Sequence, residues 1–288
     1  MAALESLIRK RLMTNSSLAE KLATFGEEPA IFLQEAPDDT AEGWGDSQYP
    51  RLVFLMDTFA DAERNVMGGL SVDVICTETG YSPEDIEPHV REALAGVFFT
   101  PEDGRTFSPK WKETTVFKTT VGEQEALILG ISVIFDVYEF PLAETSDPDP
   151  IAAINRYAEK WSRDVTVIGK AELPSIYLPS RQNPAMYFRT SGFERELETC
   201  SVVWVKSRIA AHLFAPNLQD RMAWLKEFSQ DLGLAGEITM LDGSPMFIQR
   251  IQGDAKADEV TGQLTLHVRY GLLRRPVYAH TMIDLNLN

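Results

Sequence analysis

Hydrophobic side chains in the first 25 residues recur at the three- and four-residue spacing of an amphipathic helix. These positions are Leu4, Leu7, Ile8, Leu12, Leu18, Leu22 and Phe25. A second helix is predicted after Ser82, which precedes Pro83 and acidic residues. Serine is a good N-cap and proline fits the first helical turn, because neither position needs an intrahelical N–H bond. Apolar residues at helical spacing follow this start.

Between and after these helices the pattern changes to strict alternation, which is typical of half-buried strands. Strands are predicted at 49–57 and 70–78 before the second helix, and at 114–120 and 127–140 after it. The first half of the chain therefore reads helix, two strands, helix, two strands. Val133 and Phe135 of the last strand are expected in the core.

The same order recurs after a joint rich in proline and acid, in which Asp149 and Pro150 suit the start of a helix. A helix with Leu218, Met222, Leu225 and Leu232 and a strand at 246–251 belong to this second series. The matched strands are Tyr49–Phe54 with Asn183–Phe188, Leu70–Ile75 with Cys200–Val205, and Ile131–Pro141 with Leu266–Pro276. The second pair aligns Val72 with Val202 and Val74 with Trp204. The third aligns without a gap and predicts that Val268 and Tyr270 are buried.

These patterns predict an α+β fold of two tandem α-β-β-α-β-β units. Each unit is expected to have a mixed or antiparallel sheet of about four strands with helices mainly on one face. The predicted domains are 1–141 and 150–288, joined by a linker at 142–149. A single α+β domain is the alternative, because half-buried strands resemble one another.

Composition limits the functions open to this chain. The 288 residues carry a formal net charge of −16, which disfavours tight binding to duplex DNA because such binding needs cations on the phosphates. The start of the chain does not resemble a signal peptide, and no apolar run is long enough to span a bilayer. We expect Cys76 and Cys200 to be small buried residues in a reducing compartment.

The order of elements in the first half resembles the tail-completion or tail-terminator family of long-tailed bacteriophages. The segments that carry the resemblance are Leu18–Leu22, Pro29–Pro37, Tyr49–Phe54, Leu70–Ile75 and the helix leading into Ala93 and Leu94. Residues 1–141 fit best, and the second half fits as a diverged copy. Typical members contain one unit, so the doubling departs from the family pattern.

The resemblance implies a structural virion protein that forms a ring at the head-proximal end of the tail, located in the tail neck and assembled in the host cytoplasm. The implied partners are other copies of the chain, the tail tube protein, a head–tail connector or neck protein and, in a contractile tail, the sheath. DNA would only pass through the lumen. Another neck, sheath-cap or baseplate ring protein is an alternative, and a metal-dependent viral nuclease is a more distant one.

The ring could contain six chains or three. Three chains would give pseudo-sixfold symmetry, whereas six would carry twelve units. The matched halves differ at Asp73 against Val203 and at Cys76 against Lys206, which favours different roles for the two units and hence the hexamer.

Sequence motifs for catalysis are absent: the chain has no nucleophile elbow, phosphate-binding loop, dinucleotide fingerprint or zinc-protease motif. His89, His212, His267 and His280 are scattered. Asp147 and Asp149, or the acids between Glu35 and Asp46, could hold a metal for nuclease chemistry, but acids in such loops are usually solvated turn residues. We therefore predict no enzyme activity, no cofactor and no metal site.

Two basic clusters are candidate subunit or partner contacts, because cations beside aromatic rings suit an acidic neighbour. They are Arg105, Lys110, Trp111 and Lys112 in one stretch, and Arg269, Arg274 and Arg275 on the last strand. A solvated connecting loop and a DNA contact are the alternatives for the first.

The segment between Lys21 and Arg51 contains acids and no cation. Its residues Asp38, Asp39, Glu42 and Asp46 are candidates to face the lumen and repel passing DNA. A solvated outer loop is the alternative.

Overall fold

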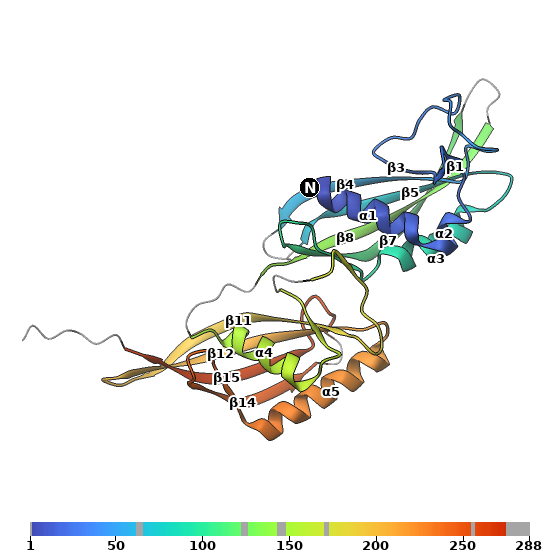
Figure 1. The fold of residues 1–288 in the computed structure, drawn as a ribbon. Helices are drawn as coiled ribbons and strands as arrows, with labels where there is room; N and C mark the ends of the chain where they lie inside the picture. Colours follow the sequence, from blue (N-terminus) through green and yellow to red (C-terminus); the bar gives the residue numbers. More distant parts are fainter. Residues whose placement is uncertain are drawn as a thin grey trace, which may run out of the picture. The chain divides into compact units, whose positions relative to one another are not determined.

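The computed structural model describes residues 2–61, 66–121, 126–142, 148–169, 173–254 and 257–274 (Figure 1). Over these ranges the chain forms five helices and a larger number of strands, most of them in two sheets, which confirms the predicted α+β class. None of the helices in these ranges has the length and apolar character needed to cross a membrane.

The chain folds into two compact units, and each draws on more than one segment. The first contains Met1–Ala143, Asp164–Tyr187 and Phe214–Arg221, and the second contains Glu144–Arg163, Phe188–Leu213 and Met222–Asn288. We expected domains at 1–141 and 150–288; the first unit also takes in two segments from the second half. One reason is that β10, at Ile176–Tyr177, pairs with β6, at Phe98–Phe99, and so extends the first sheet.

The first sheet has seven strands in the order β10-β6-β7-β8-β5-β4-β3. Its remaining strands are β3 (Ile31–Leu33), β4 (Arg51–Asp61), β5 (Val66–Thr77), β7 (Thr106–Val121) and β8 (Ala126–Phe140). The helices are α1 (Ala2–Thr14), α2 (Ser16–Ala19) and α3 (Pro83–Leu94), and β1 (Thr24–Phe25) and β2 (Glu28–Pro29) form a separate small hairpin.

Helices cover one face of this sheet. Along β5 every second residue is buried, so Leu70, Val72 and Val74 face the core. They join one hydrophobic cluster with residues of α1 and α3 such as Ile8 and Val90. The predicted burial of Val133 and Phe135 is confirmed, as is that of Cys76.

The second sheet has six strands in the order β13-β14-β15-β12-β11-β9. Its elements are β9 (Thr166–Val167), β11 (Ala185–Glu198), β12 (Val202–Phe214), β13 (Glu237–Thr239), β14 (Pro245–Gly253) and β15 (Leu264–Leu273), with α4 (Pro150–Trp161) and α5 (Leu218–Ala235).

Aromatic rings join the two helices of the second unit to its sheet. The Phe228 ring of α5 lies 5.0 Å from the Trp161 ring of α4 and 5.9 Å from the Phe188 ring of β11. Val268 and Tyr270 of β15 are buried, as predicted. Two other expectations are wrong: Cys200 is exposed, because it lies in the turn after β11, and Leu218 is exposed at the start of α5.

Polar side chains begin three of the helices. Ser82 and Asp85 form a capping box at α3, in which each side chain accepts a hydrogen bond from the backbone N–H of the other residue. Asp149 caps α4 by accepting from the Ile151 N–H at 2.8 Å. At α5, Asn217 accepts from the Asp220 N–H at 2.9 Å. The predicted starts at Ser82 and Asp149 are therefore confirmed.

The central strands of the two sheets have matching registers. In the first sheet Val72 of β5 is opposite Val133 of β8, and in the second Ser207 of β12 is opposite Val268 of β15. Each member of the second pair lies 135 residues after its counterpart. The predicted match of Val72 with Val202 is therefore five residues out of step, and it would place Val202 on the wrong face. Alternation repeats every two residues, so it cannot by itself fix the register.

The edge strands beside them keep the same offset. Val116 of β7 is opposite Ile131, and Ile251 of β14 is opposite Leu266. Both edge strands contain one bulge, between Trp111 and Glu113 in β7 and between Ile248 and Arg250 in β14. Strand β7 also starts at Thr106, eight residues before the predicted strand at 114–120, because Pro109 and the bulge interrupt its alternation.

Candidate functional site

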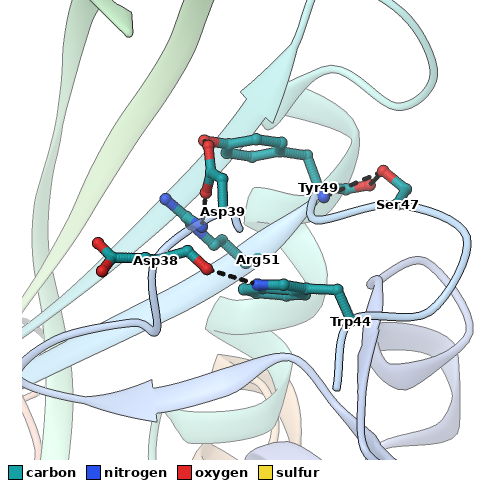
Figure 2. Close-up of polar contacts among 6 residues, drawn as sticks. All are labelled: Asp38, Asp39, Trp44, Ser47, Tyr49 and Arg51. Carbon is teal, nitrogen blue, oxygen red and sulfur yellow. Dashed lines mark hydrogen bonds and ion pairs between the residues drawn. The ribbon is translucent and has the colours of Figure 1, made fainter. Parts of the chain in front are cut away.

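The acidic loop before β4 is held by hydrogen bonds and an ion pair (Figure 2). The two carboxylate oxygens of Asp39 accept separate bonds, one from Arg51 Nη1 at 2.5 Å and one from the Tyr49 hydroxyl at 2.8 Å. The Trp44 indole N–H donates to the backbone carbonyl of Asp38 at 2.9 Å. These contacts tie the loop to the start of β4.

Arg51 is the centre of this arrangement. Its guanidinium lies 4.5 Å from the centre of the Tyr49 ring and 5.6 Å from that of Trp44, and only 14% of its side chain is exposed. Burial and the hydrogen bond to Asp39 raise the pKa of Tyr49 to about 12, so its hydroxyl remains a donor at neutral pH.

The four candidate lumen acids are thus not equivalent. Asp39 is paired with Arg51, whereas the side chains of Asp38, Glu42 and Asp46 are exposed. Arg51 supplies a cation that the sequence between Lys21 and Arg51 lacks. The exposed negative charge of the loop therefore comes from the other acids, and their orientation toward a lumen stays a prediction.

The first basic cluster lies in and just before β7 rather than in a connecting loop. Arg105 pairs with Asp103 at 2.8 Å, and Lys112 pairs with Asp136 of β8 at 3.2 Å. The Arg91 guanidinium of α3 stacks on the Trp111 ring at 3.8 Å.

The second cluster is also engaged within the chain. Arg269 pairs with Glu196 at 2.6 Å and lies over the Trp204 ring at 4.1 Å, while Arg274 pairs with Glu198 at 2.7 Å. Lys206 shares Glu196 with Arg269, at 2.7 Å. These two cations hold the pKa of the Glu196 carboxyl below its usual value. Arg275 lies outside the described residues.

The histidines and acids considered for metal binding do not converge. His212 is buried, with Nδ1 donating to the Glu259 carbonyl at 2.8 Å and Nε2 accepting from Arg189 Nε at 3.1 Å. His267 bonds Gln252, and Asp149 is the helix cap. In the described ranges no three His, Cys, Asp or Glu side chains come together as a possible metal site. His280 and Asp147 lie outside those ranges.

Two sheet edges are open over much of their length, a feature that the sequence analysis missed. Strand β9 pairs only with Ala185 and Met186 of β11, and β6 pairs with β7 only at Phe107. Among the described residues, no strand lies beside the outer edge of β11 after this point or beside that of β7 from Lys110 onward.

Exposed apolar side chains mark both edges. Val116 on β7 is 68% exposed, and Phe193 on β11 is 77% exposed. Figure 1 shows β11 and β12 running past α4, which leaves their far ends uncovered by that helix. The run Phe193–Glu198, with charged residues on both sides of Leu197, is the sequence signal that could have indicated an exposed strand.

Comparisons with models of protein families and with curated proteins give no match for this chain.

Proposed function

We propose that the chain contains two tandem copies of one α-β-β-α-β-β unit. In this scheme α1, β4, β5, α3, β7 and β8 of the first copy correspond to α4, β11, β12, α5, β14 and β15 of the second. The corresponding strands have the same neighbours, in the orders β7-β8-β5-β4 and β14-β15-β12-β11.

The 135-residue offset supports this duplication. It relates the pairs in the β5–β8 and β12–β15 ladders and those in the β7–β8 and β14–β15 ladders. The same offset relates the starts of α3 and α5, at Pro83 and Leu218, and their capping pairs, Ser82–Asp85 and Asn217–Asp220. Unrelated half-buried strands have no reason to share one offset with a helix and its cap.

We further infer that the protein is a structural component of a phage tail, which forms a ring at the head-proximal end, caps the tail tube and joins it to the head connector. The observation that carries this proposal is the order of the major elements of the first copy, which is the order on which the family resemblance rests. We assign it no catalytic role and no cofactor. Its proposed partners are itself, the tail tube protein and a connector or neck protein.

Other ring proteins of the neck, sheath cap or baseplate fit the same architecture. A two-unit chain that associates head to tail closes into a ring when its contacts are heterologous and the rotation closes. An electron micrograph of rings bound at the end of assembled tail tubes, and not at the baseplate, would favour the terminator role. Binding to the opposite end would favour a baseplate protein.

The proposed ring has six chains. A hexamer of the 32.3 kDa chain has a mass of about 194 kDa, and a trimer about 97 kDa. Native mass spectrometry of the purified protein is expected to give the larger mass. The trimer mass would overturn the hexamer but keep the ring, and a monomer at micromolar concentration would count against ring formation by this chain alone.

We also propose that the exposed acids Asp38, Glu42 and Asp46 face the lumen, where like charge keeps DNA from binding as it passes. The absence of a cation in residues 22–50 and the exposure of these side chains support this placement. A density map of the ring with these residues on the outer wall would overturn it.

A further inference from the structure

We propose that neighbouring copies in the ring associate edge to edge, with the open edge of β7 in one copy pairing antiparallel to the open edge of β11 in the next. The inference rests on the proposed ring and names its subunit contact. An open edge presents unpaired backbone N–H and C=O groups, and another strand can add to it. The two edges differ, so the contact is heterologous, as a ring requires.

The charges on the two edges are complementary. Strand β7 carries Lys110, Lys112 and Lys118 against a single acid, Glu113, between Lys110 and Lys118. The exposed part of β11 carries three acids, Glu194, Glu196 and Glu198, all at alternate positions. Residues at alternate positions of a strand lie on the same face, so these acids form one row.

One register joins the two edges with opposite charges facing each other. It places Lys110 opposite Glu198, Trp111 opposite Leu197 and Lys112 opposite Glu196. Trp111 and Leu197 are 37% and 52% exposed, and the pairing would cover both. Cross-strand pairs of opposite charge and of apolar side chains are the contacts that stabilise adjacent strands.

The ion pairs inside each sheet extend this register. Lys112 already contacts Asp136 of β8 at 3.2 Å, and Glu196 contacts Lys206 of β12 at 2.7 Å. Joining the edges places Lys112 beside Glu196 and gives a continuous row of alternating charge, Asp136–Lys112–Glu196–Lys206. The faces also agree. Lys112 lies on the face of its sheet that is opposite Trp111, which contacts α3, and Glu196 lies on the face opposite the buried Tyr270.

Charge reversal on each edge tests the pairing. We expect Lys110→Glu with Lys112→Glu to abolish the ring mass in native mass spectrometry, and Glu196→Lys with Glu198→Lys to do the same. In an equimolar mixture of the two variants, each reversed edge meets an oppositely charged edge of the other variant. A ring of alternating copies, three of each in a hexamer, should therefore re-form. All four substitutions in one chain should also restore the ring.

A matched control reverses two exposed lysines away from both edges, Lys160→Glu on α4 and Lys226→Glu on α5. It changes the net charge by the same amount as the β7 variant and should keep the ring. Retention of the ring in either edge variant, or failure of both the mixture and the four-substitution chain to restore it, would overturn the pairing.

Cysteine cross-linking decides the matter if reversal at Glu196 unfolds the strand by removing the partner of Lys206. In a Cys200→Ser background, chains with Trp111→Cys are mixed with chains with Leu197→Cys and treated with diamide. We expect a covalent dimer, and a control pair with Lys160→Cys in place of Trp111→Cys should give none. Absence of the dimer while the ring persists would overturn the edge pairing alone. A monomeric wild-type chain would overturn the proposed ring as well.

Discussion

At the scale of single residues, neighbours in the chain have different roles because of what they contact. Asp38 and Asp39 are adjacent and chemically identical. Only Asp39 has its carboxylate bound by both Arg51 and Tyr49, while the Asp38 carboxylate is exposed and its backbone carbonyl accepts from Trp44. Charge composition alone treats the two as equal contributors to an acidic surface.

We expect Asp39→Asn to lower the free energy of unfolding by about 1–2 kcal/mol, because it removes a charge-assisted acceptor from the poorly exposed Arg51. Urea unfolding followed by tryptophan fluorescence measures the change. The control Asp38→Asn removes an exposed charge and should stay within about 0.5 kcal/mol of wild type. Equal effects of the two substitutions would contradict the assigned role of Asp39.

His212 makes stability depend on pH. Burial, assisted by the nearby Arg189, lowers the pKa of its imidazole from 6.5 to about 4 in the folded chain. The unfolded chain therefore binds a proton at a higher pH than the folded chain. This residue's contribution to stability is complete above pH 6.5 and is lost as the pH falls toward 4.

Between pH 6.5 and 5 the loss from His212 should be about 2 kcal/mol, as one pKa unit corresponds to about 1.4 kcal/mol. Urea midpoints measured across this range should fall more steeply for wild type than for His212→Gln. The variant His267→Gln, on the half-exposed face of β15, should keep the wild-type slope. A wild-type slope in His212→Gln would show that this histidine does not titrate as described.

At the scale of elements, helix starts were predictable and strand registers were not. Ser82 and Asp149 act through backbone groups only two or three residues away, so a short stretch of sequence contains all the relevant contacts. The cap at Asn217 has the same local geometry. Register depends instead on which distant strand lies opposite.

Replacing the caps should cost similar amounts in the two halves. We expect Ser82→Ala and Asn217→Ala each to lower the free energy of unfolding by about 1 kcal/mol, because each leaves a helix N–H without its side-chain acceptor. Thermal or urea unfolding measures this change, and Thr40→Ala in the exposed loop serves as a control. If only one of the two caps affected stability, the correspondence of α3 with α5 would lose support.

At the scale of the whole molecule, the structure changes the meaning of the charged clusters. The cations predicted as partner contacts, including Arg105, Lys112 and Arg269, contact acids of their own sheets. What they offer a neighbour is therefore not an isolated positive patch. It is a row of alternating charge that ends at an open sheet edge, and the expected loss of the 194 kDa species on charge reversal tests this role.

The sequence by itself determined the α+β class, most of the elements, the helix caps and the burial of Val133, Phe135, Val268 and Tyr270. These features depend on local hydrogen bonds and on the periodicity of each element, both of which are present in short stretches of chain. A half-buried strand must alternate whatever its neighbours are. The pattern therefore predicts which side chains of a strand are buried.

Only the tertiary structure decided the ladder register, the inclusion of Asp164–Tyr187 in the first unit, the start of β7 and the ion pairs of the basic clusters. Each joins groups far apart in the sequence. Arg269 and Glu196, for example, are separated by 73 positions. Alternation is unchanged when one strand slides past another by two residues, so many pairings satisfy the same pattern. Packing of the whole sheet against its helices selects one of them, and with it the edges that remain open.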